Sequence, residues 1–577
     1  MTHGERALPH HRIAYVLKAQ SAMTRTPSPE LSLGAPIFED RQLAAKAASQ
    51  GAAAAWRDAL AGDVQTALEQ VRGSFAVGLR LAGGRVVLAV DRFAQRSLCY
   101  RVVDGDLLFA ERADDLRAGG EDVDPQAIFD YLFFHAIPSP RTVFHGVQRL
   151  PPGHVAVFEA GVLRVFPYWR PTFDAPRKPA VFDDLQADFL RLLRAAVVDQ
   201  LDGSKPACFL SGGTDSSTVA GMIGEVAGRP AATYSIGFEA EGYDEMAFAR
   251  IAARRFGTEH HEYYVTPDDL VRSIPLVAQS YDQPFGNSSA LPAYYCARMA
   301  RDDGVTRLLA GDGGDELFGG NARYAKQRIF GWYGLVPGAV RRGLLQPLFD
   351  LPSMARLPVL KKGASYIEQA RVPMPDRLQM YNLLLRLGVE QVLTPAFLAR
   401  VSIDGPALHQ REVWQQAVTD SALNRTLAFD WRYTLAESDL PKVCGTTRLA
   451  GVGVGFPLLD DRLLGFSQTL PPHYKLRGLK LRWFFKEALR GFLPDEIITK
   501  KKQGFGLPFG PWLVRHAGLQ ALVRSAWAPL AERGIVNPAF LSRLIDRQLV
   551  EHPGYYGEMV WILMMLEQWL QRHAADF

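Results

Sequence analysis

The stretch from Pro206 to Ser217 constrains the fold of this chain more than any other. It reads Pro-Ala-Cys-Phe-Leu-Ser-Gly-Gly-Thr-Asp-Ser-Ser and continues into a helical pattern. The apolar run 207–210 predicts a buried strand. Gly212 and Gly213 have no Cβ, so backbone N–H groups of the turn can approach a phosphate at the N-terminus of the helix. The stretch therefore predicts a strand, a glycine turn and a helix of an α/β fold, with an anion site at the turn.

The polar residues of this turn favour a phosphate ligand that carries a metal ion. Ser211, Ser216 and Ser217 add hydroxyl donors. Asp215 would repel a phosphate, unless its carboxylate holds a Mg²⁺ ion that bridges to the phosphates. The turn lacks the Gly-Lys-Ser/Thr ending of the Walker pattern. It resembles the Ser-Gly-Gly-x-Asp-Ser loop of ATP pyrophosphatases, which cleave ATP to AMP and pyrophosphate. The alternative is a plain Gly-Ser turn between a strand and a helix.

Strands and helices alternate around this stretch. Helical patterns cover 182–201, 218–227 and 245–256, and strand patterns cover 232–238, 262–265 and 306–310. This alternation predicts a parallel sheet, whose ligands bind at the carboxyl ends of the strands. The last of these strands ends in a second glycine-rich turn, as the first strand does.

The second turn reads Ala310-Gly-Asp-Gly-Gly-Asp-Glu-Leu-Phe-Gly-Gly320. Its carboxylates Asp312 and Asp315 can face the first turn and complete a Mg²⁺–pyrophosphate site; a solvated acidic turn is the alternative. The turn resembles Ser-Gly-(Glu/Asp)-Gly-x-Asp-Glu-x-Phe-Gly-Gly of asparagine synthetases. Three further phrases resemble that family: Ser235–Phe238, Gly257–His261 and Asp282–Ala290. The resemblance is weak before residue 170, strong from 205 to 325 and intermediate afterwards.

The resemblance implies a set of site residues, with ATP and Mg²⁺ as cofactors. Strand ends and the first loop would bind ATP and its pyrophosphate through Phe209, Leu210, Ser211, Gly212, Gly213, Asp215, Ser216, Ser217, Ile236 and Gly311. Asp215 and Asp315 would bind Mg²⁺. Asp312 takes the place of a carboxylate that shapes the acyl-adenylate and amine site.

A further motif, Ile497–Pro508, contains Lys500, Lys501 and Lys502. Lys502 aligns with the family's catalytic lysine in Lys-Gln-Gly-Phe. Its ammonium would stabilise negative charge as pyrophosphate leaves and as the tetrahedral intermediate collapses, since lysine is a compact point charge. For Lys500 and Lys501 a solvated basic run is the alternative.

One segment, Lys442–Asp460, departs from the family pattern. Asparagine synthetases carry an Asp-Arg pair where this chain has Cys444-Gly445, and a Glu and an Arg where it has Gly453 and Gly455. The replaced residues lie near the family's acyl-substrate region, so the sequence does not establish aspartate as the substrate; the alternative is that the lost charges were structural and the substrate is unchanged.

The first 175 residues predict an α+β domain. A helix is expected at 41–60 and strands at 74–81, 85–90 and 107–110, with a hairpin turn at Gly83-Gly84. Gly73–Ala76 and Asp91–Tyr100 resemble the glutaminase half of asparagine synthetases, an Ntn-hydrolase-like fold. That glutaminase attacks glutamine with an N-terminal cysteine. Here position 2 is Thr2 and the first cysteine is Cys99, so we expect a retained scaffold without glutamine hydrolysis.

Length and composition limit the remaining possibilities. A chain of 577 residues is too long for one core, and we expect a glutaminase-like domain over 1–175 and a synthetase domain over 180–577. The formal charge of +4 gives no reason to expect nucleic acid or an anionic membrane as a partner. Four scattered cysteines without metal-ligand spacing indicate reduced thiols and a cytoplasmic location. A homodimer is compatible with the sequence.

These features together predict an ATP-dependent, AMP-forming amide synthetase. A small-molecule or peptide carboxylate would become an acyl-adenylate, which ammonia or another amine then attacks. β-Lactam synthetases and lasso-peptide cyclases resemble asparagine synthetases with the same loss of the N-terminal cysteine, so a specialised ligase or cyclase remains open. A non-catalytic scaffold protein is a further alternative, which damage in the pyrophosphate loop would favour; the loop is intact.

Overall fold

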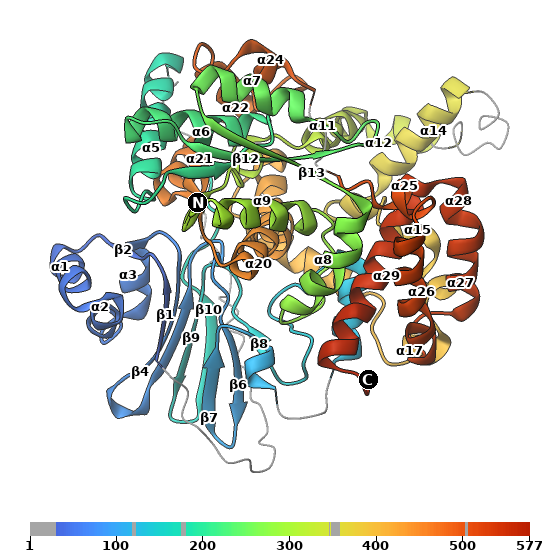
Figure 1. The fold of residues 1–577 in the computed structure, drawn as a ribbon, viewed down its shortest axis with the longest axis horizontal. Coiled ribbons are helices and arrows are strands. Elements are labelled where there is room, and N and C mark those ends of the chain that lie inside the picture. The colour runs from blue at the N-terminus through green and yellow to red at the C-terminus, as the bar shows by residue number, and fades with distance from the viewer. Residues whose placement is uncertain (1–29, 118–122, 175–180, 346, 348–357, 502–505) are drawn as a thin grey trace, which may run out of the picture. The chain divides into compact units, whose positions relative to one another are not determined.

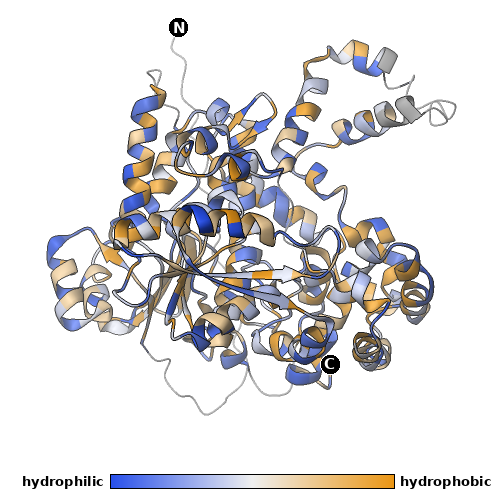
Figure 2. Cartoon of the chain, turned by 45° about the horizontal axis from the view of Figure 1, so that its top comes forward, coloured by the Kyte–Doolittle hydropathy of each residue, from blue (hydrophilic) through white to orange (hydrophobic). Residues whose placement is uncertain are grey.

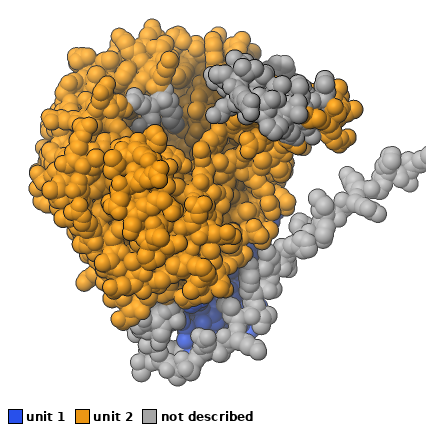
Figure 3. Space-filling view, turned by 90° about the vertical axis from the view of Figure 1, so that its right-hand side faces the viewer, with its two compact units in different colours: residues 1–119, 139–170 blue, residues 120–138, 171–577 orange. Residues whose placement is uncertain are grey.

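The computed structural model describes residues 30–117, 123–174, 181–345, 347, 358–501 and 506–577. The chain divides into two compact units (Figure 3). Unit 1 comprises residues 1–119 and 139–170, and unit 2 comprises residues 120–138 and 171–577. Helix α4 (Pro125–Phe134) therefore belongs to unit 2, although unit 1 precedes and follows it in sequence. The predicted division into residues 1–175 and 180–577 does not separate α4, which precedes residue 175 but belongs to unit 2.

Unit 1 is built on an antiparallel sheet with the order β1-β4-β5-β9-β10. Its strands are β1 (Leu31–Gly34), β4 (Phe75–Arg80), β5 (Val86–Val90), β9 (His154–Glu159) and β10 (Val162–Pro167). A smaller sheet has the order β7-β6-β8, with β6 (Cys99–Val103), β7 (Asp106–Ala110) and β8 (Gln148–Arg149). Figure 1 shows α1 (Arg41–Gln50), α2 (Ala52–Ala59) and α3 (Val64–Glu69) on one side of the larger sheet.

The two faces of the larger sheet pack into separate cores, because successive side chains of a strand point to opposite faces. Val77 and Leu79 join Trp56 of α2 in the core on the helix side. Ala76 and Leu88 join the core formed with β6 and β7 on the other side. The α+β character predicted for this region is confirmed, as is the Gly83-Gly84 hairpin between β4 and β5. The helix expected at 41–60 is interrupted at Gly51, whose φ of 89° separates α1 from α2.

Unit 2 contains a parallel sheet with the order β13-β12-β11-β14-β15, which confirms the predicted parallel sheet. The strands are β11 (Ala207–Phe209), β12 (Ala232–Phe238), β13 (Glu259–Val265), β14 (Arg307–Leu309) and β15 (Gly453–Gly455). From β11 the chain adds β12 and β13 on one side, then returns to the other side of β11 for β14 and β15. The order therefore reverses between β11 and β14, the position at which parallel sheets bind ligands.

Helices occupy the segments around these strands, and they carry both hydrophobic and hydrophilic residues (Figure 2). Before β14 they are α5 (Phe182–Val198), α6 (Thr214–Ala227), α7 (Met246–Phe256), α8 (Pro267–Ser280) and α9 (Ala290–Asp302). Between β14 and β15 they include α10 (Gly314–Phe318), α11 (Ala322–Leu335), α12 (Gly338–Val340), α14 (Pro358–Arg371), α18 (Gly405–Gln416), α19 (Ala422–Asp430) and α20 (Leu440–Ala450). After β15 they include α22 (Pro472–Lys475), α23 (Trp483–Ala488), α28 (Leu549–Glu551) and α29 (Pro553–His573). Within the described part of the chain, no helix is long and apolar enough to cross a membrane.

Candidate active site

The two glycine-rich turns meet at the carboxyl ends of β11 and β14, which are neighbours in the sheet. A Cβ on Gly311 would lie 2.8 Å from the backbone N of Ser216 and 2.9 Å from the carbonyl carbon of Asp215. Real Cβ atoms essentially never come that close to a backbone atom. Glycine at position 311 therefore allows the second turn to pack directly against the first.

The first turn is held by its own serines. The backbone N of Ser211 donates to Ser216 Oγ (3.1 Å), and Gly213 N donates to Ser211 Oγ (3.3 Å). Gly212 has a φ of 68°, and a Cβ there would collide with the backbone of α7 at Ala249. Helix α6 begins at Thr214, inside the loop and four residues before the expected start at 218. The first turn of α6 thus forms part of the loop, and its N-terminus faces the turn.

Asp215 and Asp315 converge on one cation, the guanidinium of Arg482. Arg482 Nη1 donates to Asp215 Oδ2 (2.9 Å) and to Asp315 Oδ1 (2.7 Å), and Nη2 donates to Asp215 Oδ1. Burial lowers the pKa of Arg482 to about 9. Its backbone is left-handed (φ 54°) at the N-terminus of α23, and its amide N donates to Gly319 O (3.1 Å). Sequence reasoning missed Arg482, which lies 167 residues after Asp315. The only signal was general: two neighbouring, partly buried carboxylates favour a cation between them.

The donors at this position fit Mg²⁺ and phosphate. Two carboxylates that reach the same guanidinium can also reach a single cation, and carboxylate oxygens are the ligands that Mg²⁺ prefers. The hydroxyl of Ser217 is buried and has no hydrogen-bond partner among the described residues. A buried polar group without a partner is a candidate for binding a ligand.

Phe209, Ile236 and Gly311 lie at the carboxyl ends of adjacent strands. Phe209 ends β11, Ile236 lies near the end of β12, and Gly311 follows β14. Strand β12 holds the start of the first turn in place, because Leu210 N donates to Tyr234 O (3.0 Å) and Ser235 Oγ donates to Leu210 O. The three residues predicted to bind adenosine therefore lie at the same edge of the sheet as the first turn.

Asp312 faces α20, where it meets Lys442 and Asp439. Lys442 Nζ lies 2.9 Å from Asp439 Oδ1 and 3.8 Å from Asp312 Oδ1. Burial raises the pKa of Asp312 to about 6, against the opposing effect of Lys442. Burial alone would lower the pKa of Lys442, but Asp439 and Asp312 more than offset it, so this pKa stands above its ordinary value. The second turn thus presents Asp315 to the phosphate loop and Asp312 to α20.

Comparisons with known proteins decide the family. The Asparagine synthase family model matches residues 188–571, which is more than half of the chain, and the Glutamine amidotransferase domain model matches residues 58–169. The chain belongs to the asparagine synthase family. Together with its relatives, this membership indicates an enzyme of the ligase class.

Curated relatives cover most of the chain at low identity. Asparagine synthetase [glutamine-hydrolyzing] 1 of Bacillus subtilis is 25% identical over 519 residues, 88% of this chain and 78% of the relative. A putative asparagine synthetase 2 of Methanocaldococcus jannaschii is 32% identical over 248 residues, 41% of this chain and 47% of the relative. Amidase chyE of Penicillium rubens is 23% identical over 502 residues, 79% of this chain and 73% of the relative. The family therefore includes relatives whose names denote different reactions.

Two of the three glycines that depart from the family pattern, Gly445 and Gly455, have little room for larger side chains, whereas a Cβ on the exposed Gly453 would meet no atom closer than 3.4 Å. A Cβ on Gly445 of α20 would collide with the ring of Tyr281. A Cβ on Gly455 would collide with the Gln200 side chain and lie 2.9 Å from Arg307 Nη2. Neighbouring side chains thus fill the space at both glycines, and the Arg307 guanidinium lies beside Gly455.

The lysine motif is described only up to residue 501. Lys502, the predicted catalytic lysine, lies outside the described residues, as does Thr2. Lys500 is not part of a solvated run, so that alternative is wrong for this residue: its Nζ lies 2.8 Å from Glu245 Oε1 and 4.3 Å from the Phe248 ring centroid. Glu245 and Phe248, at the start of α7, supply partners that the sequence did not reveal. Lys501 is exposed, in agreement with a solvated position.

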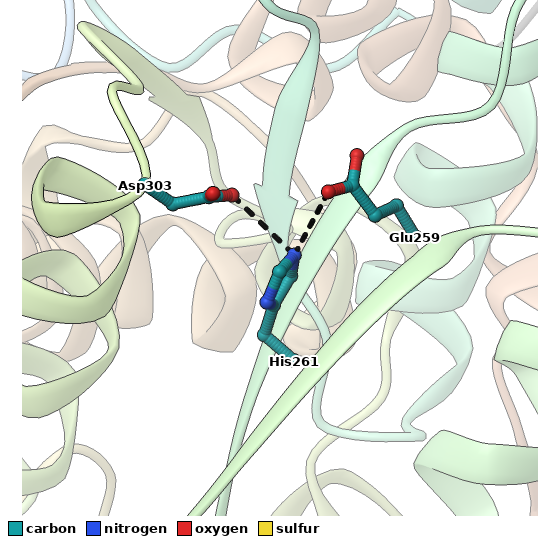
Figure 4. Close-up of side chains that lie close together, drawn as sticks. All are labelled: Glu259, His261 and Asp303. Carbon is teal, nitrogen blue, oxygen red and sulfur yellow. Dashed lines mark ion pairs between the residues drawn. The ribbon is translucent and has the colours of Figure 1, made fainter.

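A second polar cluster lies at the amino ends of the strands, the edge opposite the two turns. His261 Nε2 lies 3.3 Å from Glu259 Oε1 and 3.4 Å from Asp303 Oδ2 (Figure 4). These three side chains could supply metal ligands. However, Lys205 Nζ already pairs with Asp303 Oδ2 (2.7 Å) and Glu259 Oε1 (3.1 Å), and Tyr234 donates to Asp303. The cluster is therefore an ion-pair network in which a lysine balances both carboxylates.

Proposed function

We propose that this chain activates a carboxylate with ATP and joins it to an amine, releasing AMP and pyrophosphate. The observation that carries the proposal is the convergence of Asp215 and Asp315, from two different turns, at the position where the strand order reverses. Membership of the asparagine synthase family, which indicates a ligase, supports it. The intact first turn argues against a non-catalytic scaffold.

Pyrophosphate would bind in the first turn. Its backbone N–H groups, the hydroxyls of Ser211, Ser216 and Ser217, and the N-terminus of α6 would contact the phosphate oxygens. Mg²⁺, held by Asp215 and Asp315, would neutralise charge on the phosphates. Arg482 adds a buried cation beside both carboxylates, and Lys502 would add the ammonium expected from the family motif. Preorganised charges of this kind stabilise a leaving anion.

The reaction would proceed in two steps. In the first, a substrate carboxylate oxygen attacks the α-phosphorus of ATP, and pyrophosphate leaves. In the second, an amine nitrogen attacks the carbonyl carbon of the acyl-adenylate, loses a proton and expels AMP. Asp312 lies where the second turn faces α20, and its raised pKa suits a group that accepts a proton near neutral pH. We assign Asp312 to the orientation of the incoming amine and to that proton.

The acyl substrate is a small-molecule or peptide carboxylate. The filled space at Gly445 and Gly455 favours a substrate other than free aspartate. Tyr281, Gln200 and Arg307 occupy the space into which the charged side chains of the family pattern would extend. This observation makes a specialised amide ligase or cyclase, of the β-lactam synthetase or lasso-peptide cyclase kind, the second candidate. In either case the nucleotide site is the same.

The nucleotide site can be tested without knowledge of the acyl substrate. A fluorescent ATP analogue should bind the wild-type chain more tightly with Mg²⁺ than without it. Asp215→Asn and Asp315→Asn keep side-chain shape but remove charge, so each should lose this Mg²⁺ dependence while circular dichroism stays unchanged. Asp302→Asn, at an exposed residue of α9, is the matched control. Retention of the Mg²⁺ effect in both site variants would show that the assignment is wrong.

Catalysis is tested by ATP–pyrophosphate exchange over a panel of carboxylates that begins with aspartate. The carboxylate that supports exchange identifies the acyl substrate, and the same two variants should then abolish exchange. Normal exchange in both variants would contradict the proposed chemistry, even if ATP binds elsewhere.

A further inference from the structure

Helix α11 carries large apolar side chains on two faces; among the described residues one face packs against α14 and the other is exposed. Phe330 and Tyr333 are buried against Ile367 and Ala370 of α14. On a different face, Trp332 is 50% exposed and Leu335 is 81% exposed. Val340, in the adjoining α12, is 41% exposed. Single exposed apolar residues are ordinary, but here three large ones occur within nine residues of chain.

The same segment is strongly basic. Residues 322–345 contain five Lys or Arg and no Asp or Glu. The segment thus carries +5 and the whole chain +4, so the remainder carries −1. The formal charge of the whole chain gave no reason to expect an anionic membrane as a partner, because it does not reveal that the positive charge is concentrated in this one segment.

Two cations of the segment, Arg341 and Arg342, directly follow the exposed Val340 in the chain. Arg342 is exposed, and the Arg341 guanidinium lies 5.4 Å from the Tyr333 ring centroid. Lys326, also exposed, lies 3.9 Å from the ring centroid of Tyr381, which is itself 53% exposed. By contrast, Arg323 pairs with buried Asp430 in the interior. Residues 332–342 of the segment therefore combine exposed Trp, Leu and Val side chains with two arginines.

The segment adjoins a projecting part of unit 2. Figure 1 shows α14, which packs against α11, projecting beside α12, and Figure 2 shows hydrophobic and hydrophilic residues mixed along this projection. The exposed side chains are carried on the outer surface of helices. Side chains exposed in this way can insert into the headgroup region of a lipid bilayer, whereas an extended peptide usually binds in a groove.

We propose that the surface formed by Trp332, Leu335, Val340, Arg341 and Arg342 binds an anionic phospholipid membrane. Tryptophan and aliphatic side chains partition into the interfacial region of a bilayer, and nearby arginines are attracted to anionic headgroups. The chain would rest on the membrane surface without crossing it. This proposal does not depend on the proposed function.

The test is co-sedimentation of the full chain with two kinds of vesicle. One kind is phosphatidylcholine alone, and the other is phosphatidylcholine with phosphatidylglycerol. The wild-type chain should pellet with the anionic vesicles far more than with the neutral ones, and added salt should weaken binding, since exposed charges are screened. Equal pelleting with both kinds, or with neither, would overturn the proposal.

Two double variants separate the contributions. Trp332→Ser with Leu335→Ser should lower partitioning to anionic vesicles roughly tenfold or more, because two large apolar side chains are removed. Arg341→Gln with Arg342→Gln should remove most of the preference for anionic over neutral lipid. Leu408→Ser with Arg547→Gln changes an exposed leucine and an exposed arginine elsewhere, and it should pellet like the wild type.

Two outcomes would contradict the assignment of the surface. Wild-type pelleting by the serine variant would show that other residues bind the vesicles. A wild-type chain that ignores vesicles but forms an oligomer by light scattering, lost in the serine variant, would show instead that the face joins two copies of this chain.

Discussion

A single guanidinium, that of Arg482, joins the two aspartates that we assign to Mg²⁺. Arg482→Gln should lower the rate of ATP–pyrophosphate exchange by roughly 10²–10³, the usual scale for one preorganised donor. It should also lower Tm, because it removes the buried guanidinium that pairs with two partly buried carboxylates. Mg²⁺ would then replace the missing charge, so Mg²⁺ should raise the Tm of this variant more than that of the wild type.

The control for Arg482 is Arg490→Gln, since Arg490 is half exposed and pairs with Glu487 and Asp495 at the surface. Exchange and Tm should stay close to wild type in this variant. If Mg²⁺ shifts the Tm of the wild type and of Arg482→Gln equally, the hypothesis that Mg²⁺ and Arg482 both bind Asp215 and Asp315 is wrong.

Lys475 is fully buried, and its ammonium has only neutral partners among the interactions described. Nζ lies 3.3 Å from Asn424 Oδ1 and 4.8 Å from the Phe173 ring centroid. Burial lowers the pKa of Lys475 to about 7, against about 10.4 in an unfolded chain. Between these values the unfolded chain holds a proton that the folded chain lacks, so this residue destabilises the fold progressively as pH falls from 10.4 to 7.

Lys475→Met should therefore stabilise the protein most near pH 7 and least near pH 10. The linkage amounts to on the order of 4 kcal/mol at pH 7, from which the lost contact with Asn424 subtracts about 1. Urea unfolding of both proteins between pH 7 and 10 measures the difference, with Lys480→Met at an exposed position as the control. A difference that does not change with pH would show that Lys475 keeps its proton when folded.

At the scale of elements, the first turn depends on Gly212. The residue combines a φ of 68° with a backbone neighbour, Ala249 of α7, at the place where a Cβ would lie. Gly212→Ala should push the turn away from α7, lower Tm and abolish Mg²⁺-dependent nucleotide binding. Backbone strain and collision together make a loss of more than about 2 kcal/mol reasonable.

Gly224, twelve residues further along the chain and within α6, offers a matched control. Nothing lies within 4 Å of a Cβ at this position. Gly224→Ala should stabilise the protein by about 1 kcal/mol, since alanine is the better helix former, and should leave nucleotide binding unchanged. Nucleotide binding by Gly212→Ala at the wild-type level would show that the turn does not form the site.

The sequence predicted the elements best where side-chain pattern and glycines agree. The strand expected at 232–238 is β12 to the residue, because it is a run rich in β-branched and aromatic residues between turn signals. The helix expected from 218 starts at Thr214, since the pattern of apolar residues begins later than the hydrogen bonds do. The helix expected at 41–60 missed the break at Gly51, where a left-handed residue ends α1.

The candidate site was predictable where its residues share a motif. Asp215, Asp312 and Asp315 lie in two glycine-rich turns, and parallel topology alone brings such turns together. Lys442 opens a segment that the family pattern marks, but its ion pair with Asp312 was not predicted. Arg482 was missed because no local pattern marks a side chain whose partners are 167 and 267 residues away. The solvated alternative stayed open for Lys500 for the same reason, because its partner, Glu245 at the N-cap of α7, lies far away in the sequence.

At the scale of the whole molecule, unit 1 retains its sheets and its match to the Glutamine amidotransferase domain. We nevertheless predict that the purified chain does not release glutamate from glutamine, because position 2 is Thr2 and no cysteine precedes Cys99. The measurement is glutamate formation against protein concentration, with Thr2→Ala as the control. Release that scales with the wild-type protein and disappears in Thr2→Ala would contradict the prediction.

Helix α4 limits how this family can exchange its parts during evolution. It is encoded between two segments of unit 1, yet Tyr131 donates to Ile562 O of α29 (2.8 Å), and Gly286 N donates to His135 O (2.8 Å). A recombination event at one junction near residue 170 would deliver a foreign copy of α4 along with a foreign unit 1. Successful hybrids must therefore either inherit α4 with its parent α29 or carry compensating changes at these contacts, so the two units are expected to share one ancestry.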